Sequence, residues 1–452
     1  MRDVFSSAAV AACFDDESLV RAMLAFECAL AEAQAEVGLI PASAAEPIRD
    51  AANAADFDYA ELAREARRAG TIAIPLVKHF TRIVASQDEY AARYVHFGVT
   101  SQDVQDSALV LQLREATIVL LAVIDQLGDA LATLAERHRD TPTVARTLLQ
   151  PATPVPFGWK VAVWLDAVTR SRSQLAVAAA QACVLQFGGA SGVRSAIGPQ
   201  GDAIAEAVAR KLDLALPTVP WHSVRDRVAR VASEIGIVCS IAGKIATDVA
   251  LLMQPEIGEV REPAGEGRGG SSALPHKRNP VGAMTAREAA LRAPGLVATL
   301  IASVAGEHER GLGQWQGQAW TLRDLYAATG SAIEAIVDVV EGLDVDVDAM
   351  RRNLDATRGL VYAEALSIAL TPALGKQAAH KRVEALCQRV LTDKSTLEAT
   401  VADDRELTSI VDASARAALF DPRRQFGAAA AMIDAALKAW RHPEDRDAVS
   451  SA

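Results

Sequence analysis

The sequence predicts an all-α protein, and three features carry that prediction. Leucine recurs every seven residues through one stretch, which is the spacing of a buried stripe along a long helix. The four positions are Leu113, Leu120, Leu127 and Leu134. Similar apolar segments cover about 224–253, 281–304 and 322–340, whereas the alternating pattern of strands is scarce. With 50% hydrophobic but only 5% aromatic residues, the chain can form a large aliphatic core.

A chain of 452 residues is long enough for two or three domains. We expect an N-terminal helical domain over 1–101, a central long-helix bundle over 102–353 and a C-terminal helical domain over 354–452. Long helices usually need partners, so oligomerisation through the central bundle is expected.

The first helix is predicted to begin at Asp15 and Asp16, which are favoured capping residues. It should end before Gly38 and Pro41, since both residues interrupt helices. The hydrophilic tail after His442 is expected to be disordered.

Charge and cysteine patterns argue against several functional classes. With a formal net charge of −11 and no dense basic stripe, the chain is not expected to bind nucleic acid. Its five cysteines are scattered, which suits a reducing cytoplasm better than a disulfide framework or a zinc site. The longest apolar stretch, near 116–124, is too short to span a bilayer. We therefore expect a cytoplasmic protein that does not bind membranes.

The segment 267–280 gathers hydroxyl, cationic and amide side chains in a glycine-rich loop ahead of a helix. It reads Gly-Arg-Gly-Gly-Ser-Ser-Ala-Leu-Pro-His-Lys-Arg-Asn-Pro. Asn279 is a favoured N-cap and Pro280 suits the first helical position, so free N–H groups at the helix start should hold a carboxylate. The glycines alone are more typical of an ordinary turn. The serine hydroxyls and Lys277 shift the interpretation towards an anion site with a proton-transfer residue.

Residues 270–280 of this loop resemble the signature of the fumarase/aspartase superfamily. The resemblance implies an all-helical fold, a homotetramer whose active sites draw on three subunits, and addition or elimination beside a carboxylate. It also implies that Ser271 moves a proton and that Ser272 contacts the substrate. Lys277 and Asn279 would stabilise negative charge on the adjacent carboxylate. No metal or cofactor is required by this chemistry.

A second polar cluster, His-Phe-Gly-Val-Thr-Ser-Gln-Asp, lies at 96–103. Its donors could bind a carboxylate, although a polar capped loop is the plainer interpretation. The cluster resembles the superfamily stretch His-x-Gly-x-Thr-Ser-x-Asp. The resemblance implies that Thr100 and Ser101 bind the substrate and that His96 is a catalytic-site residue, with its role left open.

The segment 146–154 departs from the superfamily pattern. Relatives have Arg-Thr-His-Gly-Gln-Pro-Ala where this chain has Arg-Thr-Leu-Leu-Gln-Pro-Ala, so Leu148 replaces a histidine that protonates poor leaving groups. A carboxylate needs no such acid, because the pKa of its conjugate acid is about 4. Intramolecular lactonisation meets that condition. Gln150, Arg225 and Arg310 are candidates for binding the remaining carboxylates, and the two arginines could equally form surface or interdomain ion pairs.

Within the superfamily, the chain most resembles the lactonising cycloisomerases of aromatic-compound catabolism, so a small tricarboxylate derived from muconate is the expected substrate. A carbon–nitrogen lyase of the adenylosuccinate type is the alternative. Leu148 argues against it, since a departing amine needs a positioned acid. A non-catalytic helical protein derived from such an enzyme is a further alternative, which does not explain why Ser271, Lys277 and Thr100 are present.

Overall fold

The computed structural model describes residues 2–442 and is 69% helical. Within these residues the strands form only two short two-stranded sheets. The all-α prediction is therefore confirmed. The tail after His442, predicted to be disordered, lies outside the described residues.

The chain forms two compact units, each assembled from three separate segments. The first unit consists of Met1–Val123, Ser171–Ser240 and Glu288–Ala332. The second unit consists of Ile124–Arg170, Ile241–Arg287 and Ile333–Ala452. The division into three consecutive domains stays a prediction.

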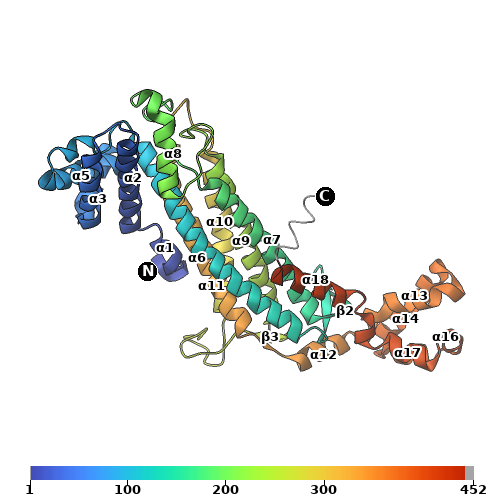
Figure 1. Ribbon diagram of the computed structural model, residues 1–452. Helices are drawn as coiled ribbons and strands as arrows, with labels where there is room; N and C mark the ends of the chain where they lie inside the picture. The colour runs from blue at the N-terminus through green and yellow to red at the C-terminus, as the bar shows by residue number, and fades with distance from the viewer. Residues whose placement is uncertain (1, 443–452) are drawn as a thin grey trace. The chain divides into compact units, whose positions relative to one another are not determined.

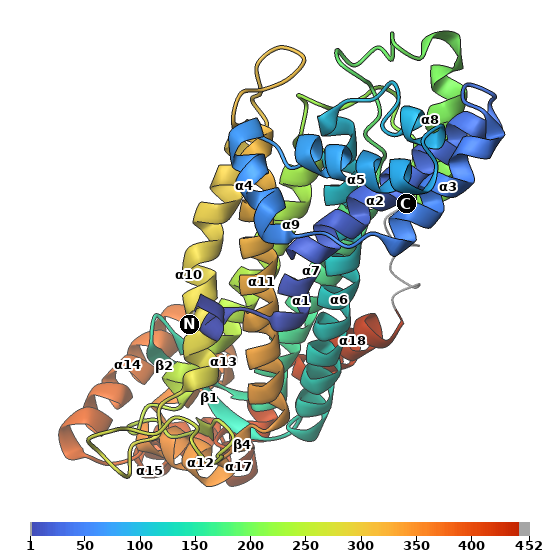
Figure 2. The same cartoon turned by 90° about the vertical axis from the view of Figure 1, so that its left-hand side faces the viewer.

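Five long helices contribute residues to both units. They are α6 (Ser101–Arg137), α7 (Phe157–Ala182), α9 (Asp226–Leu252), α10 (Val281–Ala302) and α11 (Gln314–Glu341). Within each unit, segments of these helices run side by side (Figures 1 and 2). The four leucines of the predicted stripe lie on α6 and are at most 3% exposed, so the prediction of a buried heptad stripe is confirmed.

The first unit also holds the N-terminal helices and, from the middle of the chain, α8 with the 3-10 helix before it. They are α1 (Ala8–Ala12), α2 (Asp16–Glu36), α3 (Ala42–Ala54), α4 (Tyr59–Ala69), α5 (Ala73–Gln87) and α8 (Gly201–Leu212), with 3-10 helices at Arg2–Phe5, Ala91–Tyr94 and Gly198–Gln200. The Asp15 carboxylate accepts the Ser18 N–H at 2.8 Å, so α2 begins at the predicted cap, and it ends before Gly38 as predicted. The preceding α1 is too short to show a helical period in the sequence.

The second unit contains a β-hairpin and the C-terminal helices. Its strands are β1 (Pro142–Thr147), which pairs with β2 (Gln150–Pro156), and β3 (Val260–Arg261), which pairs with β4 (Asp344–Val345). Its helices are α12 (Val347–Ala356), α13 (Ala363–Leu374), α14 (Lys376–Asp393), α15 (Leu397–Ala402), α16 (Arg405–Ile410), α17 (Ala413–Leu419) and α18 (Ala429–Arg441), with 3-10 helices at Leu360–Tyr362 and Pro422–Gln425. Buried residues of α12 to α17 share one apolar cluster with Val144 of the hairpin, which ties the hairpin to these helices.

Two long helices, α6 and α9, are apolar enough to cross a membrane by length and composition alone. The prediction that the longest apolar stretch is too short to span a bilayer is therefore wrong as an argument from length. It counted uninterrupted apolar residues, whereas an average of hydropathy over a window tolerates isolated polar residues. Of the apolar windows, 61% in α6 and 50% in α9 is buried inside the protein. The core helices of soluble proteins pass the same test.

Candidate active site

Asp103 organises the turn that leads into α6. Its buried carboxylate accepts hydrogen bonds from the backbone N–H groups of Thr100 (3.1 Å), Gly188 (2.9 Å) and Gly189 (2.9 Å). His222 Nε2 lies 2.8 Å from the same carboxylate. The contact back to Thr100 is one half of a capping box, which fixes the first turn of the helix. One buried carboxylate therefore holds three separate segments of the chain in a single geometry.

The Thr100 hydroxyl contacts an arginine predicted for the same site. Arg310 donates from Nη1 to Thr100 Oγ1 and from Nη2 to the Gly189 carbonyl, each at 3.3 Å. Arg310 Nε is buried and has no hydrogen-bond partner among the described residues. Ser101 is partly exposed at the start of α6, next to Thr100. A cation and two hydroxyls thus lie on neighbouring segments, which is a set of donors suited to a carboxylate.

His96 pairs with a glutamate of α2. Its Nδ1 lies 2.6 Å from Oε1 of Glu27, whose side chain is almost completely buried. Burial by itself would lower the pKa of His96. The charge and hydrogen bond of Glu27, with the charge of Asp103, instead raise that pKa above its ordinary value.

In the second unit, Ser271 forms a turn centred on its hydroxyl. Its Oγ accepts the backbone N–H groups of Ala273 (3.4 Å) and Leu274 (3.1 Å). Two amide donors on one hydroxyl oxygen stabilise its oxyanion form, which is what a serine needs in order to exchange a proton. Ser272 and Lys277 are exposed on the same loop.

Asn279 closes this loop. Its backbone N–H donates to the Gly269 carbonyl at 2.8 Å, and its Nδ2 donates to the Gly270 carbonyl at 3.3 Å. Gly269 has φ +66°, and a Cβ there would lie 2.5 Å from the Asn279 carbonyl oxygen, so the closure requires glycine. The loop that carries Ser271 and Lys277 is therefore closed at its base.

The N-terminus of α10 is occupied by a carboxylate of the protein itself. Buried Glu262 accepts the N–H groups of Gly282 (3.0 Å) and Ala283 (2.8 Å). The helix begins at Val281, one residue after the proline predicted to start it. The prediction that Asn279 caps the helix and leaves its N–H groups free for a substrate is wrong, because Glu262 takes those donors.

A cavity of about 370 Å³ adjoins the loop in the second unit. Arg268, His276, Arg278 and Asn279 are among its lining residues. Arg268 is paired with Glu262 and Asp338, whereas His276 and Arg278 are exposed. A larger cavity of about 560 Å³ lies in the first unit, but none of the predicted site residues lines it.

Two family models match the chain. A family model described as lyase matches residues 5–295, and one described as adenylosuccinate lyase C-terminus matches residues 359–436. The chain belongs to the lyase family of the fumarase/aspartase superfamily. The fold predicted by resemblance is therefore confirmed.

This lyase has relatives that match almost the whole chain. It is 48% identical to the 3-carboxy-cis,cis-muconate cycloisomerase of Bradyrhizobium diazoefficiens, over 96% of each chain. It is 47% identical to the protein of the same name from Pseudomonas aeruginosa, over 96% of this chain and 94% of that one. The crystal structure of 3-carboxy-cis,cis-muconate lactonizing enzyme from Pseudomonas putida matches with a TM-score of 0.91 and 42% identity, over 97% of this chain and 98% of that one.

In this lyase the segment that departs from the superfamily pattern forms the tip of the β1–β2 hairpin. Thr147 pairs with Gln150, and Leu148 and Leu149 form the two-residue turn between them, with φ of 49° and 63°. Left-handed backbone costs a residue with a Cβ roughly 1–2 kcal/mol. Leu148 is 97% exposed and Leu149 72%, so two strained apolar residues project from the tip. Gln150 is exposed beside them.

Strand β1 of the hairpin is fixed by Glu259, whose side chain is fully buried. Arg146 forms a bidentate pair with it, at 2.6 Å and 3.1 Å. Thr143 Oγ1 donates at 3.1 Å, and Asn353 Nδ2 donates at 2.8 Å. The position of the tip therefore depends on a carboxylate that no sequence motif marks.

Arg225 is fully buried in the first unit. It donates through both Nη atoms to Asp106 and through Nε to Gln318, and its guanidinium lies 4.9 Å from the centre of the Trp221 ring. These contacts favour the ion-pair alternative for Arg225 over direct substrate binding.

The predicted residues thus form two groups. In the first unit the structure brings together His96, Thr100, Ser101 and Arg310 around the start of α6. The second unit carries Ser271, Ser272, Lys277 and Asn279 on the loop, and Gln150 on the hairpin. Sequence reasoning missed Glu27, Glu259 and Glu262. In the sequence, the only sign of each is an acidic residue among apolar or structured neighbours. Acidic residues are common at the surface too, so this sign does not identify a buried carboxylate.

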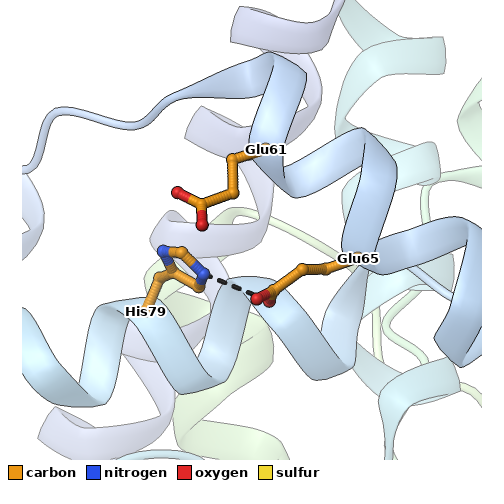
Figure 3. A group of neighbouring side chains, drawn as sticks. All are labelled: Glu61, Glu65 and His79. Atoms are coloured by element: carbon orange, nitrogen blue, oxygen red, sulfur yellow. Dashed lines mark hydrogen bonds and ion pairs between the residues drawn. The ribbon is translucent and has the colours of Figure 1, made fainter.

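One group of side chains has the spacing of a metal site but is already satisfied. Glu61 and Glu65 of α4 and His79 of α5 have ligand atoms within 4.8 Å of one another. Figure 3 shows the His79 ring between the two carboxylates. His79 Nε2 contacts Glu65 at 3.1 Å, and Lys78 contacts it at 3.5 Å. The Glu65 carboxylate that a cation would need is therefore already in contact with two neighbouring side chains.

Proposed function

We propose that the chain is a cycloisomerase that converts 3-carboxy-cis,cis-muconate to 4-carboxymuconolactone in aromatic-compound catabolism, and that it works in the cytoplasm. The observation that carries the proposal is 48% identity over 96% of the chain to a relative named for this activity. The five cysteines are all unpaired, which supports a reducing compartment.

In the proposed reaction an oxygen of one terminal carboxylate forms a bond to the alkene carbon that bears the third carboxylate. This carbon is C4, and its alkene partner is C5, in the numbering of the lactone product. The π electrons move to C5 and into the adjacent carboxylate, giving an aci-carboxylate anion. Ser271 gives its proton to C5, and the alkoxide regains a proton from water. The net change is ring closure with uptake of one proton, without oxidation or reduction.

The geometry supports Ser271 as the residue that delivers the proton to C5. The N–H groups of Ala273 and Leu274 stabilise the alkoxide that remains after proton transfer. Lys277 would bind the carboxylate that gains charge, and Asn279 would keep the loop closed through its contact with Gly270.

The other substrate carboxylates are assigned to the remaining donors. Thr100, Ser101 and Arg310 form one set, and Gln150 and Ser272 supplement it. Leu148 supports lactonisation over amine elimination. It presents an exposed aliphatic side chain where an amine-releasing lyase needs an acid.

The superfamily is typically oligomeric, and we assign this chain to a homotetramer with shared active sites. Exposed apolar side chains support an assembly: Leu148 and Leu149 on the hairpin tip, Leu291 on α10 (83% exposed) and Trp320 on α11 (62% exposed). Sedimentation equilibrium measures the mass directly. Mixing Ser271→Ala with Thr100→Ala protein and refolding them together should restore part of the activity if one site draws on two subunits.

Purified protein incubated with 3-carboxy-cis,cis-muconate tests the activity. Lactonisation breaks the conjugated diene, so ultraviolet absorbance should fall and a pH indicator should report the uptake of one proton. A parallel incubation with adenylosuccinate tests the amine-eliminating alternative. Turnover of adenylosuccinate alone would overturn the proposal, and inertness towards both would favour the non-catalytic alternative.

A further inference from the structure

One face of α2 holds the turn that carries His96. Glu27 and Gln34 lie two helical turns apart, so their side chains point the same way, and both are buried. Glu27 Oε1 contacts His96 Nδ1 at 2.6 Å, and Gln34 Nε2 donates to the Phe97 carbonyl at 2.7 Å. His96 has φ 59°, so the turn adopts a left-handed backbone that these two contacts stabilise.

The electrostatics of this turn require a positive charge. Glu27 is 3% exposed, and its Oε2 is buried without a hydrogen-bond partner among the described residues. A buried carboxylate is strongly unfavourable unless a cation pairs with it. The charged groups that interact with His96 are Glu27 on α2 and Asp103 on α6, and both are acidic. An imidazolium at position 96 pairs directly with Glu27 and carries a charge opposite to that of Asp103.

We propose that Glu27 is a positioning residue that keeps His96 as an imidazolium, whose Nε2–H then serves as a cationic donor to a substrate carboxylate. The identity of the carboxylate rests on the proposed function, whereas the pairing of Glu27 with His96 does not. His96 is 19% exposed at its side chain and lies four residues before Thr100, so its ring is partly open to solvent within the segment that carries the predicted carboxylate-binding residues. In this role His96 neither removes nor delivers the proton at C5.

The pairing is tested without substrate. NMR titration of protein labelled with ¹³C-histidine follows all eight histidines, and the variant His96→Gln identifies the resonance of His96. In Glu27→Gln the pKa of His96 should fall, because a charge and a hydrogen bond that favour the protonated ring are weakened. The expected fall corresponds to an acid dissociation constant about tenfold larger. Glu65→Gln is the matched control. It alters the other histidine–glutamate pair, His79–Glu65, and should leave His96 unchanged (Figure 3).

The role in binding is tested by kinetics with 3-carboxy-cis,cis-muconate. The wild-type kcat/KM should fall as pH rises through the raised pKa of His96, because the cation is lost. In Glu27→Gln this fall should move to lower pH, and at pH 8 KM should rise about tenfold with little change in kcat. Glu65→Gln should keep the wild-type profile.

A His96 titration that is the same in wild type and Glu27→Gln would overturn the pairing. A fall in kcat without a rise in KM would overturn the binding role. If Glu27→Gln does not fold, Glu27→Asp keeps the charge but shortens the reach, and it should shift the titration in the same direction by less. Absence of turnover in wild type would contradict the proposed function and leave the NMR result to decide the pairing.

Discussion

Asp106 and Arg225 form a bidentate ion pair with distances of 2.7 Å and 2.8 Å, and both side chains are buried. Removing one partner of such a pair leaves an uncompensated charge inside the protein. Asp106→Ala should therefore lower the free energy of unfolding by about 3–5 kcal/mol. Urea denaturation followed by circular dichroism measures this change.

The matched control is Asp226→Ala, which breaks an exposed pair with Arg230 at 3.4 Å on α9. It should change the free energy of unfolding by less than about 1 kcal/mol. Equal effects of the two substitutions would contradict the assignment of Arg225 to a buried structural pair.

The hairpin tip stores backbone strain at Leu149, where φ is 63°. Leu149→Gly should raise the free energy of unfolding by about 1 kcal/mol, because glycine adopts this conformation without the steric penalty. Leu149→Ala removes the same side chain but keeps a Cβ, and it should give no such gain. The comparison is made by urea denaturation at one protein concentration, since association alters apparent stability. Equal stability of the two variants would show that the strain is absent.

Glu262 supplies the cap of α10 from a segment about twenty residues upstream. Glu262→Ala should expose the N–H groups of Gly282 and Ala283, with loss of about 1–2 kcal/mol of local stability. Hydrogen exchange of these two amides should accelerate about tenfold or more.

The corresponding control removes a different helix cap. Asp346→Ala takes away the carboxylate that accepts the Ala349 N–H of α12 at 2.7 Å, and it should leave exchange at the start of α10 unchanged. Unaltered exchange at Gly282 in Glu262→Ala would mean that another group caps the helix.

Sequence reasoning succeeded where the information is local. The seven-residue spacing of leucines predicts the buried face of α6, because helical periodicity depends only on neighbouring residues. Asp15 predicts the start of α2, because its side chain caps the helix. Sequence reasoning failed at α10, where Asn279 and Pro280 have the right types for a helix start. A distant carboxylate, Glu262, competes for the same N–H groups, and no local pattern reveals that competition.

The candidate site shows the same contrast between local motifs, which the sequence predicts, and long-range contacts, which it does not. Ser271, Thr100 and Ser101 stand in motifs that can be read directly. The carboxylates that hold the surrounding backbone, Glu27 and Glu259, lie 69 and 113 residues from the side chains they pair with. Such pairs are set by tertiary packing, so a single sequence does not predict them.

The central claim is that the Ser271 hydroxyl moves the proton at C5, and the kcat of Ser271→Ala with 3-carboxy-cis,cis-muconate tests it most directly. General acid catalysis contributes about 10²- to 10⁴-fold, so kcat should fall by that factor while the circular dichroism spectrum is unchanged. Thr396→Ala is the control, because it also removes a hydroxyl that accepts a backbone N–H in the second unit, and it should keep wild-type kcat. A Ser271→Ala enzyme with kcat within about twofold of wild type would contradict the claim.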